Sequence, residues 1–522
     1  MIDERGQQAR HNPSTTRVRR DIATDAAAHA LRLLEKIRTS TQRPGPDTAG
    51  EQAGKPHAIV IGGGISGLVA AHELQQTGHR VTVLEAAADF GGCLRRMEVA
   101  GLQLDAGAES FAVRSNTVAE FLQELDMGQK IVPTSGMSAW LTQQRDEHVE
   151  SHPMPASSLM GIPAQVRSDE VRALIGRPAV VRAAADLVTP MPKKWATEKL
   201  SVGEVVRQRM GSAVLEQLVA PVVAGVYSTD PNQVDIDAAA PGLRQAMQDT
   251  GSLARAVAQL QGQAPAGSRV AGLQDGMYTL ITELTAQLRE AGVNLVRNAP
   301  VTALAHDPQA AEPFTVTSHT EVLHADKVVV ATQAAAAAPL LQPLLPAGTL
   351  AGAGRESNSI ALVILVVDKP ELDEAPRGSG VLVTEGSTIK AKALTHSTAK
   401  WPWLGDATGP GTHVVRLSYG RIGHREPLVE AGNDAALTSQ AIADAATILG
   451  VDVGEDDVLG SAISRFSDMV PLTGSAQRQA NARLDEALQD LQGLSVVGAW
   501  RSGTGLARVI AHTRAQVAIS AS

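Results

Sequence analysis

The sequence predicts an α/β fold in which a parallel sheet is interrupted by long insertions. A strand, a glycine-rich turn and a helix follow one another at "IVIGGGISGL" (residues 59–68), and the next strand, "VTVLE", ends at Glu85. Near the other end, "LSVVGAW" (494–500) again runs from a strand into a glycine turn and a helix. Continuous apolar runs of this length are typical of buried parallel strands. We therefore expect chain from both ends to complete one sheet.

The segment before the first strand has a different composition. Residues 1–55 end in "RPGPDTAGEQAGKP", which is rich in proline, glycine and polar residues. A linker of this kind is typical of chain that lies outside a packed core. We expect a poorly ordered N-terminal extension over residues 1–55, with the ordered fold beginning near His57.

The glycines of the first turn are expected to have separate roles. Gly62 permits the tight turn after the strand, Gly64 lets the backbone approach a pyrophosphate, and Gly67 lets the helix pack close to the strand. The N-terminus of that helix offers free N–H groups to phosphates. Glu85 stands where an acid accepts ribose hydroxyls, and it disfavours NADP because a 2′-phosphate would be repelled there. NAD and FAD both fit this unit.

Two insertions are expected between the halves of the sheet. Residues 115–250 show apolar positions mostly at helical spacing, and residues 360–419 are dominated by strands. Within the first insertion, the Pro-rich "TPMPKKW" (189–195) is expected to form an exposed loop. The expected domains are a discontinuous cofactor-binding domain (56–114, 265–345 and 466–522), a mainly helical domain (115–264) and a β-rich substrate-binding domain (346–465).

The composition disfavours several classes of protein. The net charge is −9 and no basic stripe is evident, so we expect no nucleic-acid partner. The single cysteine, Cys93, cannot form an internal disulfide or the redox pair of a flavin disulfide reductase, and it favours a reducing compartment. The 14 histidines form no metal-binding cluster, so no metal is expected. No stretch predicts a transmembrane helix; we expect a cytoplasmic protein, with peripheral contact to a membrane left open.

Three further features favour FAD over NAD. Gly91 and Gly92 follow Glu85 after a short loop, and "LDAGAES" (104–110) supplies another turn of small residues. The C-terminal "GAWRSGTGLARVI" (498–510) supplies a second helix N-terminus, placed to face the pyrimidine end of a flavin. Together, and in this order, these turns indicate a flavin site.

Several stretches also carry a family resemblance. The pattern "VIGGGISGL…VTVLEAAADFGG" resembles the FAD site of the amine-oxidase and phytoene-desaturase superfamily. More narrowly, "DAGAESFAVR", "MPASSLMGIP", "VAPVVAGVYSTDP", "GLQDGMYTLITEL", "KWPWLGDA" and "GAWRSGTGL" resemble the oxygen-dependent protoporphyrinogen and coproporphyrinogen oxidases of the soluble bacterial type. The resemblance implies a Rossmann-like FAD-binding domain with an inserted mixed α+β substrate domain and a helical domain.

The resemblance also implies particular site residues. The FAD contacts of the family fall on Gly62, Gly63, Gly64, Ile65, Ser66, Gly67, Leu68, Glu85, Ala86, Gly91, Gly92, Gly107, Ala108, Glu109, Ser110, Val301, Gly503, Thr504, Gly505 and Leu506. Two further cofactor positions depart from the family pattern: Cys93 replaces a usual lysine or arginine, and Phe466 replaces a usual tryptophan. Arg114 matches a basic position that the family uses for a substrate propionate. No catalytic acid or base is assigned.

The function implied by the resemblance is FAD-dependent oxidation of a porphyrinogen to a porphyrin in haem synthesis. O2 would accept the electrons and form H2O2, and we expect coproporphyrinogen III to be the main substrate. Three alternatives stay open: protoporphyrinogen IX as the main substrate, another oxidase of the superfamily, and a non-catalytic flavin-binding protein. A ferrochelatase is a candidate partner.

Overall fold

A computed structural model describes residues 54–227, 230–261, 270–353, 357–420, 426–430, 432–471 and 475–521. The extension expected over residues 1–55 lies outside these ranges, apart from Gly54 and Lys55. The first strand begins at His57, where the ordered fold was expected to start.

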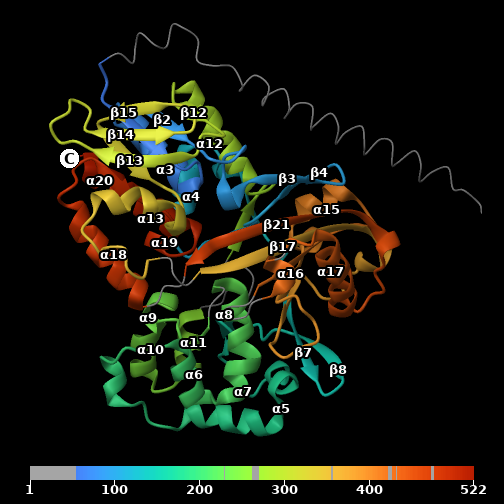
Figure 1. Ribbon diagram of the computed structural model, residues 1–522. Helices are drawn as coiled ribbons and strands as arrows, with labels where there is room; N and C mark the ends of the chain where they lie inside the picture. The colour runs from blue at the N-terminus through green and yellow to red at the C-terminus, as the bar shows by residue number, and fades with distance from the viewer. Residues whose placement is uncertain are drawn as a thin grey trace, which may run out of the picture. The chain divides into compact units, whose positions relative to one another are not determined.

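A parallel sheet combines strands from both ends of the chain. In the described ranges its order is β12 (Asn294–Val296), β2 (Arg80–Leu84), β1 (His57–Ile61), β16 (Lys327–Val330) and β22 (Leu494–Val496). Each neighbouring pair is parallel. Figure 1 shows the mixture by colour, with blue N-terminal and red C-terminal chain in the same part of the fold. The prediction that both ends complete one sheet is confirmed.

Both faces of the parallel sheet are buried. Ala58 and Val60 of β1 point to a core that also contains residues of α3 (Ile65–Gln76), α4 (Thr117–Glu124), α12 (Tyr278–Glu290) and α20 (Leu506–Ala521). Ile59 and Ile61 point to the opposite core, which includes α13 (Ala334–Leu341), α18 (Ser475–Leu488) and strands β13 (Val301–His306), β14 (Phe314–Ser318) and β15 (Val322–Ala325). Burial on both sides explains why β1 reads as a continuous apolar run.

A second, larger sheet carries most of the remaining strands. Its order in the described residues is β21 (Val458–Pro471), β17 (Ser357–Asp368), β20 (Thr412–Tyr419), β19 (Ala393–His396), β18 (Gly380–Val383), β7 (Ala139–Arg145) and β8 (His148–Pro153). One face packs on α17 (Asp434–Leu449). The other face packs on Trp401 and on β3 (Arg96–Val99) and β4 (Leu102–Asp105). These two strands follow β1, α3 and β2 in the sequence, so this face of the large sheet contacts the chain next to the first strand–helix–strand unit.

The prediction of mostly helical structure from residue 115 is wrong for residues 131–163. This stretch contains β6 (Ile131–Pro133), β7, β8, β9 (Ser158–Leu159) and β10 (Ile162–Pro163). β7 reads "AWLTQQR" and β8 reads "HVESHP", so neither has the alternation of apolar residues that identifies a half-buried strand. Their pairing with each other and with β18 decides their structure, because tertiary contacts override weak local preference.

The helical part of the first insertion begins after β10. Its main helices are α5 (Asp169–Ala184), α6 (Val202–Met210), α8 (Ala220–Tyr227), α10 (Leu243–Thr250) and α11 (Leu253–Gln261). A buried ion pair joins Arg209 Nε to Asp186 Oδ1 at 2.5 Å in its core. The prediction of an exposed loop at "TPMPKKW" is wrong for Trp195, which is fully buried among these helices, whereas Lys193 and Lys194 are exposed.

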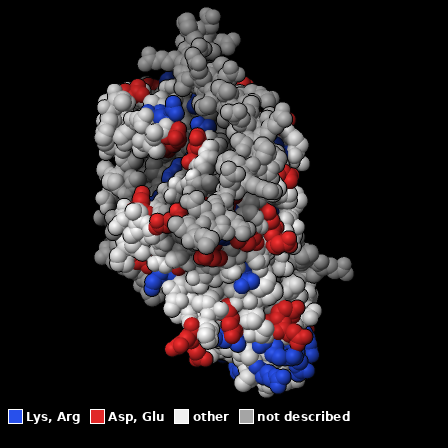
Figure 2. Space-filling model, turned by 90° about the vertical axis from the view of Figure 1, so that its right-hand side faces the viewer, with Lys and Arg blue, Asp and Glu red and all other residues white. Residues whose placement is uncertain are grey.

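The surface carries charges of both signs. Acidic and basic side chains are interspersed over the described atoms of the face in Figure 2. Among the described residues, no helix combines the length and apolarity that crossing a bilayer requires. Nor does this part of the chain hold a group of three or more His, Cys, Asp or Glu side chains arranged for a metal ion.

Candidate cofactor site

The first turn of the site, between β1 and α3, requires glycine at two positions for different reasons. Gly62 has φ +107°, and a Cβ there would lie 2.9 Å from the carbonyl oxygen of Ala331. A Cβ on Gly67 would lie only 1.9 Å from the carbonyl oxygen of Gly62. Gly62 therefore makes the tight turn, and Gly67 allows α3 to pack directly on the strand end.

Gly64 is different because its side-chain direction is open. It precedes α3 with φ −72° and ψ 177°, and a Cβ there would meet nothing within 4 Å. The first N–H groups of an α-helix have no intrahelical partner. At the start of α3 no side chain caps them either. The helix continues through Ile65, Ser66 and Leu68, which are buried in the described structure. Open space above unpaired N–H groups is the environment that a pyrophosphate needs.

The carboxylate of Glu85 lies beside this turn. Its Oε2 accepts the N–H of Gly63 at 2.6 Å, and its Oε1 accepts the N–H of Ala87 at 2.7 Å. Each carboxylate oxygen can accept a further hydrogen bond, so both can still receive ribose hydroxyls. Ala86 is exposed next to Glu85. The acid thus orders the turn as well as offering acceptors at the end of β2.

The double glycine lies against the first turn. Gly91 forms a parallel bridge with Gly64, and its N–H donates to the carbonyl oxygen of Gly63 at 2.9 Å. Gly91 and Gly92 have φ of +113° and +58°, a region that favours glycine. A Cβ on Gly92 would come within 3.6 Å of the Cα of Gly64. Two predicted glycine turns therefore form one backbone surface.

The turn at residues 107–110 packs on the chain that follows the double glycine. The N–H of Ala108 donates to the carbonyl oxygen of Cys93 at 2.9 Å. A Cβ on Gly107 would lie 2.2 Å from that same oxygen and 3.0 Å from the ring of Phe466. The structure thus brings Cys93, Gly107 and Phe466 together. Burial raises the pKa of the Cys93 thiol, so the thiol stays neutral near pH 7.

Glu109 has strong partners from the large sheet. Its Oε1 lies 2.6 Å from Lys400 Nζ, and its Oε2 lies 2.7 Å from Arg416 Nη1. The Ser397 hydroxyl also donates to Oε2, at 3.1 Å. Desolvation by burial opposes the charged form, but the two cations outweigh it and lower the pKa of Glu109 to about 2. Ser110, next in the turn, is half-buried.

A second helix N-terminus stands at the same edge of the parallel sheet. β22 ends beside β16, and the Trp500 indole N–H donates to the carbonyl oxygen of Thr332 at 3.0 Å. Gly503 and Gly505 have φ of +83° and +107°, and a Cβ on Gly505 would meet nothing within 4 Å. Thr504 and Leu506 are half-buried. α20 then packs along α3, as the red and blue helices of Figure 1 show.

The comparisons with known proteins agree with this geometry. The family model described as flavin containing amine oxidoreductase matches residues 65–511. The chain belongs to this family of flavin-containing amine oxidoreductases. A coproporphyrinogen III oxidase of Mycobacterium leprae is 31% identical over 86% of this chain and 94% of the relative, and one of Bacillus subtilis is 26% identical over 89% and 97%. The crystal structure of a putative protoporphyrinogen oxidase from Exiguobacterium sp. 255-15 superposes with a TM-score of 0.77 at 22% identity, covering 90% of this chain and 99% of that one.

Membership in the flavin-containing amine oxidoreductases makes the chain an oxidoreductase with a flavin cofactor. The residues present fit that cofactor. The space above Gly64 is open, and a Cβ at this position would occupy it. The space at Gly505 is likewise open. Between these two turns, the hydroxyl of Thr332 is buried and has no hydrogen-bond partner among the described residues. A buried polar atom of this kind at a strand end is satisfied when a polar ligand binds.

Two predicted site residues of this flavoprotein belong to none of the glycine turns. Val301 begins β13 and packs, half-buried, on the core formed by Ile59 and Ile61. Arg114 follows β5 (Phe111–Ala112) with an exposed side chain. In the described part of the chain, no hydrogen bond or ion pair joins Arg114 to another predicted site residue. Their roles stay predictions.

The sequence-based prediction missed Asp105, Lys400 and Arg416 of the flavoprotein. Asp105 accepts the N–H groups of Met277 and Tyr278, at 2.9 and 2.8 Å, and so caps the first turn of α12. Burial raises the pKa of Asp105 to about 6, although the two N–H groups and Arg416 oppose this. One signal was available: Arg416 interrupts the buried apolar strand "THVVRLSY", and charged residues are seldom buried without a partner.

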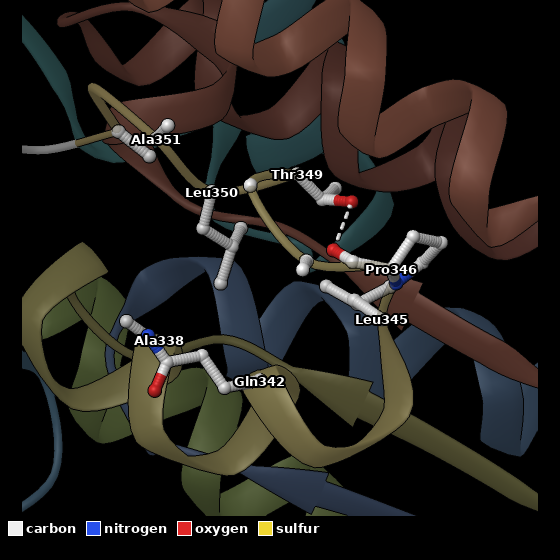
Figure 3. A pocket seen from close by; sticks show the side chains of 10 residues that line it. Ala338, Gln342, Leu345, Pro346, Thr349, Leu350 and Ala351 are labelled. Atoms are coloured by element: carbon white, nitrogen blue, oxygen red, sulfur yellow. Dashed lines mark hydrogen bonds between the residues drawn. The ribbon is translucent and has the colours of Figure 1, made fainter.

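The cavity drawn in Figure 3 lies elsewhere. It has a volume of about 520 Å³ and is formed by the end of α13, the following turn and the loop to Ala353. The Thr349 hydroxyl donates to the carbonyl oxygen of Pro346 at 2.8 Å within this loop. None of the predicted site residues lines it. The candidate cofactor site is therefore the group of glycine turns, where backbone geometry and helix ends converge, and not this cavity.

Proposed function

We propose that this chain is an FAD-dependent oxidase that converts coproporphyrinogen III to coproporphyrin III in haem synthesis, with O2 as the electron acceptor. The observation that carries the proposal is the open space above Gly64, which is flanked by the N-terminus of α3 and by the carboxylate of Glu85. The substrate is proposed because relatives that match most of the chain are named coproporphyrinogen III oxidases.

The proposed cofactor contacts divide between the two helix ends. The turn from Gly62 to Gly64 and the first N–H groups of α3 would hold the pyrophosphate, while Glu85 would accept the hydroxyls of the adenosine ribose. The backbone of Gly91, Gly92 and the 107–110 turn would line the flavin, next to Cys93 and Phe466. The turn from Gly503 to Leu506 would face its pyrimidine end. Val301 would meet the adenine.

When bound, FAD supplies the redox chemistry, because it accepts two electrons from the substrate and passes them to O2. Formation of a porphyrin from a porphyrinogen releases six electrons and six protons. Three molecules of O2 are therefore consumed and three of H2O2 are formed for each macrocycle. The protein's own task is to orient the macrocycle and to exclude water.

Arg114 is proposed to bind a propionate at the edge of the macrocycle. Its guanidinium is exposed and can bond both oxygens of a carboxylate. If Arg114 acts through binding alone, Arg114→Ala raises KM and leaves kcat unchanged. An unchanged KM would remove Arg114 from the site.

The proposal is tested with purified holoenzyme under air. We expect coproporphyrinogen III to become fluorescent as coproporphyrin III, with three equivalents of H2O2 in a peroxidase-coupled assay and matching O2 uptake. Protein from which the flavin has been removed serves as the control and should be inactive until FAD is restored. A flavin-loaded protein that oxidises no porphyrinogen would refute the proposal and leave a non-catalytic flavin protein or another oxidase of the family.

Protoporphyrinogen IX is the second candidate substrate, because the structural neighbour from Exiguobacterium is named a putative protoporphyrinogen oxidase. The two substrates carry four and two propionates, so the comparison of kcat/KM between them separates the candidates. A higher value for protoporphyrinogen IX would overturn the choice of substrate while leaving the reaction class intact.

The proposal extends to partner and location. A ferrochelatase uses the porphyrin class that this reaction produces, so it is the proposed partner for direct transfer. The cytoplasm is the proposed location, on the basis of the single cysteine. Co-purification with a ferrochelatase and cell fractionation test these two points.

A further inference from the structure

The buried charge network around Glu109 joins parts of the chain that are distant in sequence. Glu109 follows β4, whereas Lys400 ends α14 (Ser397–Lys400) and Arg416 lies in β20 of the large sheet. The side chains of Glu109, Lys400 and Arg416 are 12%, 16% and 8% exposed. The network therefore ties the 107–110 turn to the large sheet, at a strand that the second insertion contributes.

Arg416 binds two acceptors of the same turn. Nη1 donates to the carboxylate of Glu109 at 2.7 Å, and Nη2 donates to the carbonyl oxygen of Gly107. The planar guanidinium presents its donors in a fixed fork, so two bonds to one turn fix both its position and its orientation. A lysine at this position could not make both bonds with the same geometry.

The turn depends on such tethers because it belongs to no helix or strand. Residues 106–110 form neither, and two backbone bonds hold one side of the turn: Ala106 N–H to the oxygen of Arg95, and Ala108 N–H to the oxygen of Cys93. The opposite side is held by Arg416 and Lys400. Loss of these side chains would leave only the Ser397 hydroxyl bond to Glu109 on that side.

Stability alone does not account for this network. Buried ion pairs commonly contribute little compared with an apolar replacement, since removing charges from water is costly. Fixing one arrangement among several is a better attested use of buried charges. The Nε of Arg416 is also buried with no hydrogen-bond partner among the described residues. The guanidinium therefore bonds the 107–110 turn through its two Nη groups and leaves its third donor nitrogen unsatisfied.

We propose that Arg416, assisted by Lys400, is a positioning residue that holds the 107–110 turn in the shape that receives FAD. This inference rests on the proposed function in one respect, namely the assignment of that turn to the flavin. It does not depend on which substrate the enzyme oxidises.

The test measures FAD affinity by titrating the flavin-free protein and following the quenching of flavin fluorescence. Arg416→Gln removes charge-assisted hydrogen bonds, and we expect FAD to bind about tenfold more weakly. The matched control is Arg209→Gln, which breaks a similarly buried ion pair with Asp186 in the helical insertion. Both variants should lower the thermal midpoint, but Arg209→Gln should keep the wild-type FAD affinity.

Two further variants sharpen the result. Arg416→Lys keeps the charge and loses the fork, so its FAD affinity should fall between those of wild type and Arg416→Gln. Lys400→Met leaves Arg416 in place and should weaken FAD binding less than Arg416→Gln, with a shifted absorption band of the bound flavin. If Arg416→Gln does not fold, Lys400→Met decides the question.

Wild-type FAD affinity and flavin spectrum in these variants, together with lower stability, would overturn the inference and make the network purely structural. A wild-type protein that binds FAD but does not oxidise coproporphyrinogen III would refute the proposed substrate instead. The two failures are therefore distinguishable.

Discussion

At the residue scale, Gly64 and Gly67 lie one helical turn apart but face opposite environments. Gly64 faces open space with a backbone conformation that any residue can adopt, whereas Gly67 is pressed against the carbonyl oxygen of Gly62. One glycine is therefore needed by the ligand and the other by the fold. Substitutions at the two positions should separate cofactor binding from folding.

We expect Gly64→Val to fold and to lose FAD during purification, because the side chain fills the proposed pyrophosphate space. Gly67→Val should yield little folded protein, since its Cβ would overlap a backbone oxygen at 1.9 Å. The flavin-to-protein absorbance ratio and the circular dichroism spectrum measure both outcomes. Stoichiometric FAD in Gly64→Val would move the pyrophosphate away from this turn.

Glu85 is expected to contribute to FAD affinity through its carboxylate. Charge-assisted hydrogen bonds to ribose hydroxyls are worth about 1.5–3 kcal/mol each, so Glu85→Ala should weaken FAD binding by about tenfold or more. Glu312 is a suitable control, because it lies 3.9 Å from Arg80 at the opposite end of β2 and is well exposed. Equal dissociation constants for Glu85→Ala and Glu312→Ala would contradict the assignment.

Glu109 should give stability that depends on pH. Its pKa is lowered to about 2 from 4.5, so its contribution is fully present above pH 4.5 and is lost as the pH falls toward 2. The shift corresponds to about 3 kcal/mol at neutral pH. Urea unfolding of wild type and Glu109→Gln should therefore show a difference that shrinks on acidification. A difference independent of pH would mean that folding does not lower the pKa of Glu109.

The same scale shows what the sequence could predict. The roles of Gly62 and Gly67 and the place of Glu85 followed from spacing, because the strand–turn–helix unit is local. The partners of Glu109 are between 288 and 307 positions away in the chain, and no local pattern links them. The only trace was a charged residue within an apolar strand, which says that a partner exists but not which one.

At the element scale, helix α12 begins on a carboxylate that comes from another part of the chain. Asp105, at the end of β4, accepts the first two N–H groups of this helix. Helix α12 packs in the same core as α3. Asp105 lies two residues before the 107–110 turn, so it links that turn to the helices beneath the candidate cofactor site. Elements that were predicted separately are thus joined by side chains.

Asp105 should give the opposite pH dependence from Glu109. Burial raises its pKa to about 6 from 3.8, so the folded state binds this proton more tightly than the unfolded state. Its contribution to stability is fully present below pH 3.8 and falls, by about 3 kcal/mol, as the pH rises through 6. Asp105→Asn cannot ionise, so wild type should lose stability relative to this variant between pH 4 and pH 7. Parallel pH profiles in urea unfolding would contradict the raised pKa.

Strands were predicted well where both faces of the sheet are buried. They were predicted poorly where pairing with another strand decides the structure. β1, β2 and β22 are short apolar runs with glycine or polar ends, and all three were expected. β7 and β8 have mixed composition, and β8 pairs only with β7 among the described strands. β7 also pairs with β18, which lies more than 200 positions along the chain and so outside any local window.

At the scale of the whole molecule, the two helix ends that are proposed to face FAD come from opposite ends of the sequence. α3 begins at Ile65, after β1, and α20 begins at Leu506, after β22. Helix packing between them holds both N-termini at one edge of the parallel sheet. That sheet was predicted from the sequence, whereas the division of the insertions into domains stays a prediction.

The extension before the first strand is expected to be dispensable. Its composition favours no packed core, and the parallel sheet begins only at His57. A chain beginning at Lys55 should fold, bind FAD and keep the kcat/KM of the full-length protein. Lower activity with normal FAD content would show instead that residues 1–54 contribute to catalysis or substrate access.

The position of β22 at the end of the sequence has a consequence for biosynthesis. Translation produces β1 and α3 early, but the sheet edge and α20 exist only after residue 494 has left the ribosome. Contacts of such long sequence separation form slowly, because a large loop must close first. Nascent chains halted at residue 490 should therefore bind no FAD, however long they wait, and the cofactor is captured only by an essentially finished polypeptide.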